Sequence, residues 1–185
     1  MSGPHPLRTP RLDLVATTVE HLDAELDAPE TLGARLAVGR SFVAASAPIV
    51  PSSWPPGVYD RGAMRYFRER LIEGGASAAG WYGWYVITRA EPATLIAAAG
   101  YFGPPVEGTV EIGYSVVPEH RSKGYAGELA RALTEHALAM PDVTRVVAET
   151  HEQNVASRKV LERAGFRLVG AGRAPGDQRY ERRRE

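Results

Sequence analysis

The chain of 185 residues contains no cysteine. Disulfide bonds, cysteine nucleophiles and thiolate metal sites are therefore excluded. No apolar run reaches the length of about 20 residues that a membrane-spanning helix needs, and the N-terminus has no signal-peptide pattern. The 22 basic and 22 acidic residues leave no excess charge to attract nucleic acid or a membrane surface. We expect a cytoplasmic protein that binds neither.

Two common phosphate-binding patterns are also absent. The sequence has neither the P-loop string G-x-x-x-x-G-K-[ST] nor the dinucleotide fingerprint G-x-G-x-x-G. His151 with Glu149 or Glu152 does not make a convincing metal site, so no metal is expected. These absences argue against the usual nucleotide-binding and metal-dependent classes.

The composition is that of a globular domain, with 44% hydrophobic and 24% charged residues. The length is enough for a well-buried core and predicts one domain over residues 1–185. Alternating and helical spacings of apolar residues predict the element order β-α-α-α-β-β-β-α-β-α-β-β. Thr17 with Glu20 indicates a capping box at the start of the first helix, and residues 178–183 are predicted to form an edge strand.

Several strands are joined by short turns and should be antiparallel neighbours. The strand–helix–strand unit from Thr109 to Thr150 instead predicts one parallel pair with a right-handed crossover. An α/β (α+β) fold follows, with a mixed, mostly antiparallel central sheet and helices on both faces. Residues 42–59 hold four prolines and several apolar side chains. They predict a rigid loop that either contacts substrate or packs over the core as a lid.

The turn after the strand Thr109–Val117 organises the rest of the chain. The strand ends at Pro118, a basic turn follows, and Gly124 opens a helical pattern that reaches Met140. The first amides of a helix have no partner within it, and the helix dipole adds positive charge there. Gly124 lets the backbone approach a ligand closely. The turn is thus a candidate phosphate site, the alternative being an ordinary strand-to-helix connection.

The string Arg121-x-x-Gly124-x-Ala126 in this turn resembles the pyrophosphate signature of the GNAT N-acetyltransferases. Other stretches resemble the Rim-type (RimJ/RimL-like) branch of that family, which acetylates ribosomal-protein N-termini and related amines. They are Leu7-x-Thr9-Pro10-Arg11-Leu12-Asp13-Leu14, Glu111-Ile112-Gly113-Tyr114 and the helix motif from Asn154 and Ser157 to Gly165-Phe166. The four matches occur in the family's order and span nearly the whole chain.

The resemblance implies transfer of an acetyl group from acetyl-CoA, without a metal, to an amine on a protein N-terminus or a small molecule. It also implies that the strand ending at Val117 diverges from its neighbour, so that the pantetheine arm pairs with its free backbone groups. The implied cofactor-binding residues are Val116, Val117, Arg121, Ser122, Lys123, Gly124, Tyr125, Ala126, Gly127, Asn154 and Ser157. Asn154 is also a plausible helix cap.

Catalysis needs a neutral amine, and Glu111 is the candidate base. It lies on a mostly apolar strand and shares a face with Gly113 and Ser115. Its alternatives are to position the amine or to make a structural ion pair. His151 is a further candidate to face the acceptor.

The departing thiolate needs a proton donor, and here the chain departs from the family pattern. Many GNAT proteins place a tyrosine four residues before the Gly-Phe pair, where this chain has Leu161. Ser157 is the residue that the Rim-type branch offers near the sulfur, so the predicted catalytic residues are Glu111 and Ser157. Tyr114 and Tyr125 stay open as donors.

The missing tyrosine keeps a second function class open, a non-catalytic acyl-CoA-binding module with the same fold. Glu111 and Ser157 together argue for the enzyme. The acceptor is not identified by the sequence. A homodimer also stays open, because dimers are frequent among relatives of the family.

Overall fold

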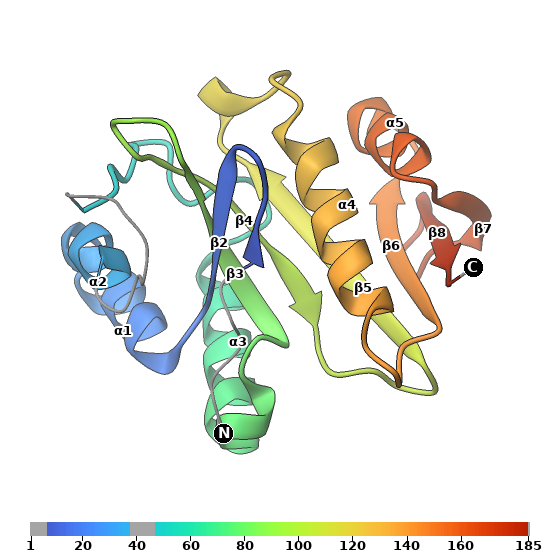
Figure 1. The fold of residues 1–185 in the computed structure, drawn as a ribbon, viewed down its shortest axis with the longest axis horizontal. Coiled ribbons are helices and arrows are strands. Elements are labelled where there is room, and N and C mark those ends of the chain that lie inside the picture. The colour runs from blue at the N-terminus through green and yellow to red at the C-terminus, as the bar shows by residue number, and fades with distance from the viewer. Residues whose placement is uncertain (1–6, 38–46, 185) are drawn as a thin grey trace.

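The computed structural model describes residues 7–37 and 47–184. Eight strands form one sheet in the spatial order β1-β2-β3-β4-β5-β6-β8-β7 (Figure 1). The strands are β1 Leu7–Arg8, β2 Leu12–Ala16, β3 Tyr82–Thr88, β4 Leu95–Phe102, β5 Thr109–Val116, β6 Arg145–His151, β7 Arg167–Ala171 and β8 Asp177–Arg183. All neighbouring pairs are antiparallel except β5 and β6, which are parallel. The predicted mixed, mostly antiparallel sheet is confirmed.

The helices are α1 Val19–Asp27, α2 Leu32–Ala37, α3 Arg61–Gly74, α4 Tyr125–Leu138 and α5 Val155–Arg163. Short 3₁₀ turns cover Pro29–Thr31, Gly75–Ala78 and Pro118–His120. None of the helices in the described ranges is both long and apolar enough to cross a membrane.

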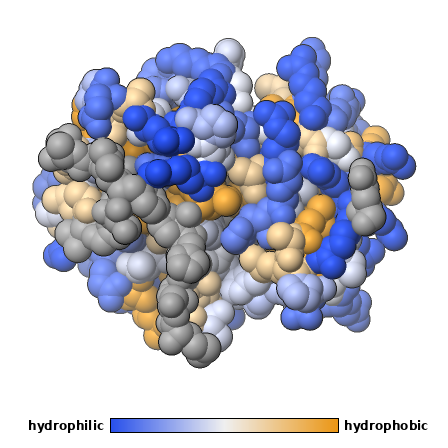
Figure 2. Space-filling view, viewed as in Figure 1, coloured by the Kyte–Doolittle hydropathy of each residue, from blue (hydrophilic) through white to orange (hydrophobic). Residues whose placement is uncertain are grey.

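Helices cover both faces of the sheet, as predicted. Successive side chains of a strand point to opposite faces. Trp84 of β3 accordingly lies in the core with Leu129 and Leu133 of α4, whereas its neighbour Tyr85 lies in a second core with Leu32 of α2. The view in Figure 1 looks onto the face covered by α4 and α5. Hydrophilic residues predominate on the outer sides of these helices in Figure 2, as expected for helices with one buried face.

The predicted capping box at Thr17 is wrong by one residue. Thr18 is the N-cap of α1: its Oγ1 accepts from the His21 amide at 3.2 Å, and the His21 Nδ1 accepts from the Thr18 amide at 3.3 Å. The Thr17 amide instead donates to the Gly83 carbonyl at 3.1 Å. Because this bond continues the pairing of β2 with β3, the helix begins one residue later, and Glu20 lies in its first turn.

The prediction of an edge strand at residues 178–183 is also wrong. The strand β8 lies between β6 and β7 and pairs with β6 from Arg145–Arg183 to His151–Asp177. The edge is β7, whose residues are all exposed. The charged residues of β8 suggested an edge, but its central Tyr180 is buried.

The described part of the proline-bearing loop, residues 47–59, is fixed to the core by a buried carboxylate. Glu25 of α1 accepts hydrogen bonds from Trp54 Nε1 at 2.6 Å, from the Tyr59 hydroxyl at 2.8 Å and from the Tyr85 hydroxyl at 2.6 Å. Burial raises the pKa of Glu25, and the donated hydrogen bonds oppose that rise. The loop therefore packs over the core, while residues 38–46 lie outside the described ranges.

We expect Glu25→Ala to lower the free energy of unfolding by about 2–4 kcal/mol, because three buried donors lose their acceptor at roughly 1–3 kcal/mol each and part of this is recovered on relaxation. Chemical denaturation followed by tryptophan fluorescence measures the loss. A change below about 0.5 kcal/mol would show that the cluster does not hold the loop.

Glu25→Gln tests the titration of the same site. A carboxyl group whose pKa is raised on folding binds more protons in the folded than in the unfolded state. The parent's stability relative to the glutamine variant should therefore decrease as the pH rises from about 4, the unfolded range, through the raised folded pKa. Thermal unfolding of the parent and of Glu25→Gln at each pH between 4 and 8 measures this difference. The contributions of the other carboxyl groups are common to both proteins and cancel in the difference.

Candidate active site

The sheet splits between its two parallel strands. β5 pairs with β6 only from Thr109 to Glu111, opposite Arg145–Val147. Beyond this point β6 stays with β8, while β5 stays with β4 as far as the pair Val116–Ala97. The edge of β5 facing β6 therefore has no strand partner from residue 112 to 116 within the described chain, as the resemblance implied.

The split leads to the predicted phosphate turn. Gly124 is the N-cap of α4, with φ 80° and ψ 0°, and no side chain caps the helix. Ser122 also adopts a left-handed conformation, with φ 59°. A non-glycine residue held in that region costs roughly 1–3 kcal/mol, and such strain tends to occur at ligand sites. The unpartnered first amides of a 14-residue helix thus follow directly after a tightly bent turn.

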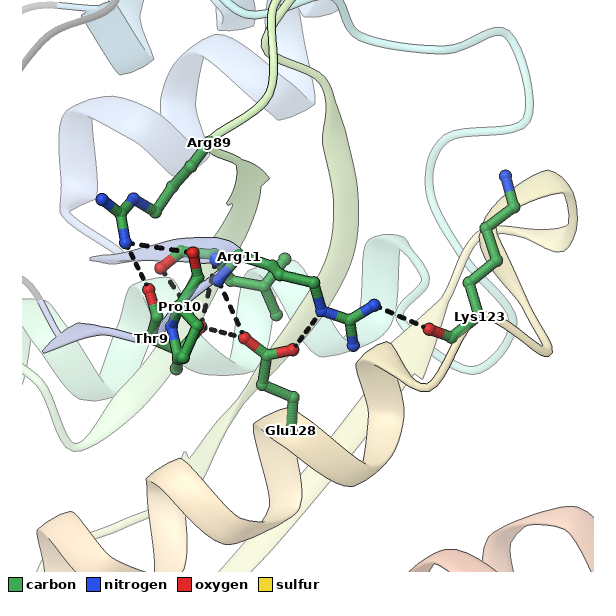
Figure 3. Close-up of polar contacts among 7 residues, drawn as sticks. Thr9, Pro10, Arg11, Arg89, Lys123 and Glu128 are labelled. Atoms are coloured by element: carbon green, nitrogen blue, oxygen red, sulfur yellow. Dashed lines mark hydrogen bonds and ion pairs between the residues drawn. The ribbon is translucent and has the colours of Figure 1, made fainter.

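The N-terminal strand segment holds this turn in place (Figure 3). Arg11 donates from Nη1 to the Lys123 carbonyl at 2.9 Å and from Nε to Glu128 at 2.7 Å. Its guanidinium lies 4.5 Å from the centre of the Tyr125 ring. Thr9 donates to the same Glu128 carboxylate at 2.5 Å. The motif that predicted only a first strand therefore also supplies the polar side chains that brace the turn.

The two basic residues of the turn behave differently from each other. Arg121 folds back, and its Nε donates to the Val116 carbonyl at 2.9 Å, so its side chain joins the turn to the end of β5. Lys123 uses its carbonyl for Arg11, and its side chain extends away from the brace in Figure 3.

A cavity of about 570 Å³ lies along the split. On β5, alternate side chains line it from opposite faces of the sheet. A Cβ at Gly113 would lie 2.7 Å from the Phe102 ring, and a Cβ at Gly57 would lie 2.7 Å from Ser115 Oγ. Glu111, Gly113 and Ser115 thus share the face toward the loop and α3, as predicted. Further lining residues are Val58, Tyr59, Ala63, Phe67, Tyr114, Glu149, His151, Asn154, Ser157, Leu161, Arg173 and Asp177.

Tyr114 and Ser157 meet on the opposite face of β5. The Tyr114 hydroxyl lies 3.1 Å from Ser157 Oγ. Burial raises the pKa of Tyr114 to about 12, so the phenol is protonated at neutral pH. Asn154 caps α5 as predicted, because its Oδ1 accepts from the Ser157 amide at 3.1 Å. Tyr125, the other open donor, lies under Arg11 and is not among the described residues that line the cavity.

Glu111 forms an ion pair with Arg173, a residue in the turn between β7 and β8. Arg173 also contacts Glu149 through Nε at 3.1 Å and through its backbone amide at 3.0 Å. Burial raises the pKa of the Glu111 carboxyl, and the Arg173 guanidinium opposes this rise. Sequence reasoning missed Arg173 because 62 residues separate it from Glu111 and no spacing pattern connects them.

His151 lines the same cavity, at the end of β6. Its Nδ1 accepts from the Gln153 amide at 3.2 Å. Within the described ranges, no three His, Asp or Glu side chains come together in a way that could hold a metal ion.

A sheet that splits at a parallel strand pair, with a phosphate turn and a helix N-terminus beside the split, is the architecture of acyltransferases with the GNAT fold. The chain belongs to this family: residues 21–167 match the model of the acetyltransferase (GNAT) domain. The chain is similar to YjdG, an uncharacterised N-acetyltransferase of Bacillus subtilis, with 36% identity over 107 residues. This match covers 57% of the chain and 62% of the relative.

Two solved structures show the same fold at low sequence identity. RimL, a ribosomal L7/L12 α-N-protein acetyltransferase in complex with coenzyme A, is 18% identical with a TM-score of 0.63, over 97% of this chain and 98% of that one. The ribosomal-protein-S5-alanine acetyltransferase of Vibrio fischeri is 16% identical with a TM-score of 0.64, over 97% of both chains. At this identity the likeness shows the fold alone.

Proposed function

We propose that the chain is an acetyl-CoA-dependent N-acetyltransferase acting on a primary amine, organised as one domain. The observation that carries the proposal is the unpaired edge of β5, which runs along the cavity and ends at the phosphate turn. The amides of residues 122–127 would bind the pyrophosphate, and the backbone of Val116 and Val117 would pair with the pantetheine arm. Asn154 and Ser157, at the start of α5, would lie beside the thioester.

The reaction that this arrangement supports is a direct attack in a ternary complex. The neutral amine attacks the thioester carbonyl carbon, the C–N bond forms and the C–S bond breaks. Glu111 accepts the proton that the amine loses, directly or through a water. The site's main contribution is to hold the two reactants in contact, which can supply a large share of the rate.

The departing thiolate takes its proton on the other face of β5. Tyr114 is protonated at neutral pH, and its hydroxyl lies next to Ser157. We propose that the proton passes from Tyr114 to the sulfur with Ser157 as the relay. Tyr114 would thus take the part of the tyrosine that Leu161 replaces.

Tyr114→Phe and Ser157→Ala should each lower kcat by roughly tenfold or more, since general acid catalysis contributes about 10²–10⁴-fold and water can partly replace the donor. Acetyl-CoA affinity should change less than threefold. Steady-state kinetics with thiol detection, together with calorimetry, separate the two effects. Parent-like turnover in both variants would remove the pair from the mechanism.

The first experiment is calorimetric binding of acetyl-CoA to the purified protein, followed by an acceptor screen that detects released thiol. Micromolar binding with amine-dependent thiol release supports the enzyme. Binding without release to any amine supports the alternative, a non-catalytic acyl-CoA-binding module. No binding by a folded protein overturns the proposed function.

A further inference from the structure

The ion pairs around Arg173 are unequal. Glu149 keeps two other partners when the guanidinium is removed: Arg179 at 2.7 Å and the backbone amide of Arg173. The Glu111 carboxylate has Arg173 as its only hydrogen-bond or ion-pair partner among the described residues. Arg173 can therefore leave Glu111 while its turn stays attached to Glu149.

The exposure of the side chains also indicates that Arg173 is the replaceable member of these ion pairs. The Arg173 side chain is 68% exposed, whereas those of Glu111 and Glu149 are 16% and 8% exposed. An ion pair with such an exposed partner contributes little to stability, so it can be exchanged for another cation at low cost. Because the Glu111 carboxylate is mostly shielded from water, its ionised form is less stable without a nearby cation. A positive charge thus stabilises the ionised form of Glu111, but this charge need not be that of Arg173.

The wall beside Glu111 is apolar. Gly113 is two residues along the same face of β5, roughly 7 Å away, and the ring of Phe102 packs where a side chain at Gly113 would lie. Phe102 is 47% exposed, and its ring centre is 6.2 Å from that of Phe67. Both rings line the cavity, together with the exposed Val58.

We infer that Arg173 is an internal stand-in for the acceptor's ammonium group, and that the acceptor is a primary amine carried on an apolar, ring-sized group. The ammonium replaces the guanidinium at Glu111, and the apolar group packs on Phe102 and Phe67. This rests on the proposed function, in which Glu111 receives the amine. The other charged and titratable residues that line the cavity are Glu149 and His151 of β6, Asp177 of β8, and Tyr59, Tyr101 and Tyr114. Arg179, which is bound to Glu149, does not line it. With Arg173 displaced, carboxylates outnumber cations there, which favours a cationic acceptor.

The test compares 2-phenylethylamine with ethylamine as acceptors at saturating acetyl-CoA and pH 8. Both are primary alkylamines, so the phenyl ring is the main difference between them. We expect kcat/KM to be higher for 2-phenylethylamine by roughly tenfold or more, as for a filled apolar pocket. Arg173→Gln should lower the KM for this amine roughly two- to fivefold, the range set by loss of an exposed ion pair. Arg173→Lys keeps the competing charge and should return KM to the parent value.

Arg179→Gln is the matched control, because Arg179 bonds to Glu149 and forms no hydrogen bond or ion pair with Glu111 within the described ranges. Its KM should stay within about twofold of the parent value, which is below the effect of an exposed ion pair. If Arg173 only supports the structure of the site, Arg173→Gln should instead raise KM, and that result overturns the inference. Equal kcat/KM values for the two amines also overturn it. Thiol release with neither amine, while acetyl-CoA still binds, also overturns it and leaves the proposed function standing. Loss of acetyl-CoA binding itself would overturn the proposed function first.

Discussion

Replacing Gly124 with valine is expected to weaken acetyl-CoA binding by a factor of at least 10². Gly124 has φ 80°, where a β-branched residue is strongly disfavoured. A Cβ there would contact Arg11 Nη2 at 3.4 Å, on the guanidinium that holds the turn through the Lys123 carbonyl. The turn must shift, and each charge-assisted hydrogen bond lost to the pyrophosphate costs roughly 1.5–3 kcal/mol. Two such bonds correspond to roughly 10²–10⁴ in Kd, which calorimetry measures.

Gly75→Val is the matched control for this variant. Gly75 also has a positive φ, 52°, but nothing lies within 4 Å of a Cβ placed there, and the residue follows α3 outside the cavity lining. It therefore carries the backbone strain without blocking a ligand. Both variants should melt below the parent, whereas only Gly124→Val should lose acetyl-CoA. If Gly124→Val binds within about threefold of the parent, the turn is not the pyrophosphate site.

The turn before α4 and the strand β5 could be predicted because their signals are local. The turn is defined by the spacing of Arg121, Gly124 and Ala126 within six consecutive residues. The alternation of side chains along β5 predicts which face of the sheet Glu111 lies on. The start of α4 and the cap at Asn154 follow from residues next to one another in the chain. In each of these cases the physical cause lies within one turn of helix or two residues of strand.

The remainder of the site depends on contacts between distant segments. Arg173 reaches Glu111 only because β8 inserts between β6 and β7, which brings the β7–β8 turn over the split. Arg11 braces the phosphate turn across 112 residues of sequence. Glu25 gave no signal in the sequence, since a carboxylate on a helix is usually solvated and this one is buried by a loop. The tertiary arrangement, not local propensity, decides these positions.

Replacing Glu111 with glutamine is expected to lower kcat by roughly 10²-fold or more, the contribution of a general base. The amide has nearly the same shape but cannot accept the amine's proton. In the proposed complex acetyl-CoA pairs with Val116 and Val117, at the other end of β5 from Glu111, so its affinity should stay within about threefold of the parent value. The parent's kcat/KM should also fall as the pH drops through the pKa of Glu111, because only the ionised carboxylate is a base. This acidic limb should lie above the ordinary glutamate range, since burial raises that pKa, and it should be absent from Glu111→Gln.

Glu181→Gln provides the control for the loss of a carboxylate that is mostly shielded from water. Glu181 of β8 is 15% exposed at its side chain, close to the 16% of Glu111, and it too pairs with arginine. It does not line the cavity, so its variant should keep the acidic limb and a turnover within about twofold of the parent, as expected for a change away from the reacting atoms. A Glu111→Gln enzyme with unchanged kcat but an altered KM would mean that the carboxylate positions the ammonium without taking its proton. In that case water removes the proton from the ammonium group. The acidic limb of the kcat/KM profile must then follow the amine's own pKa, and it must shift when amines of different basicity are compared.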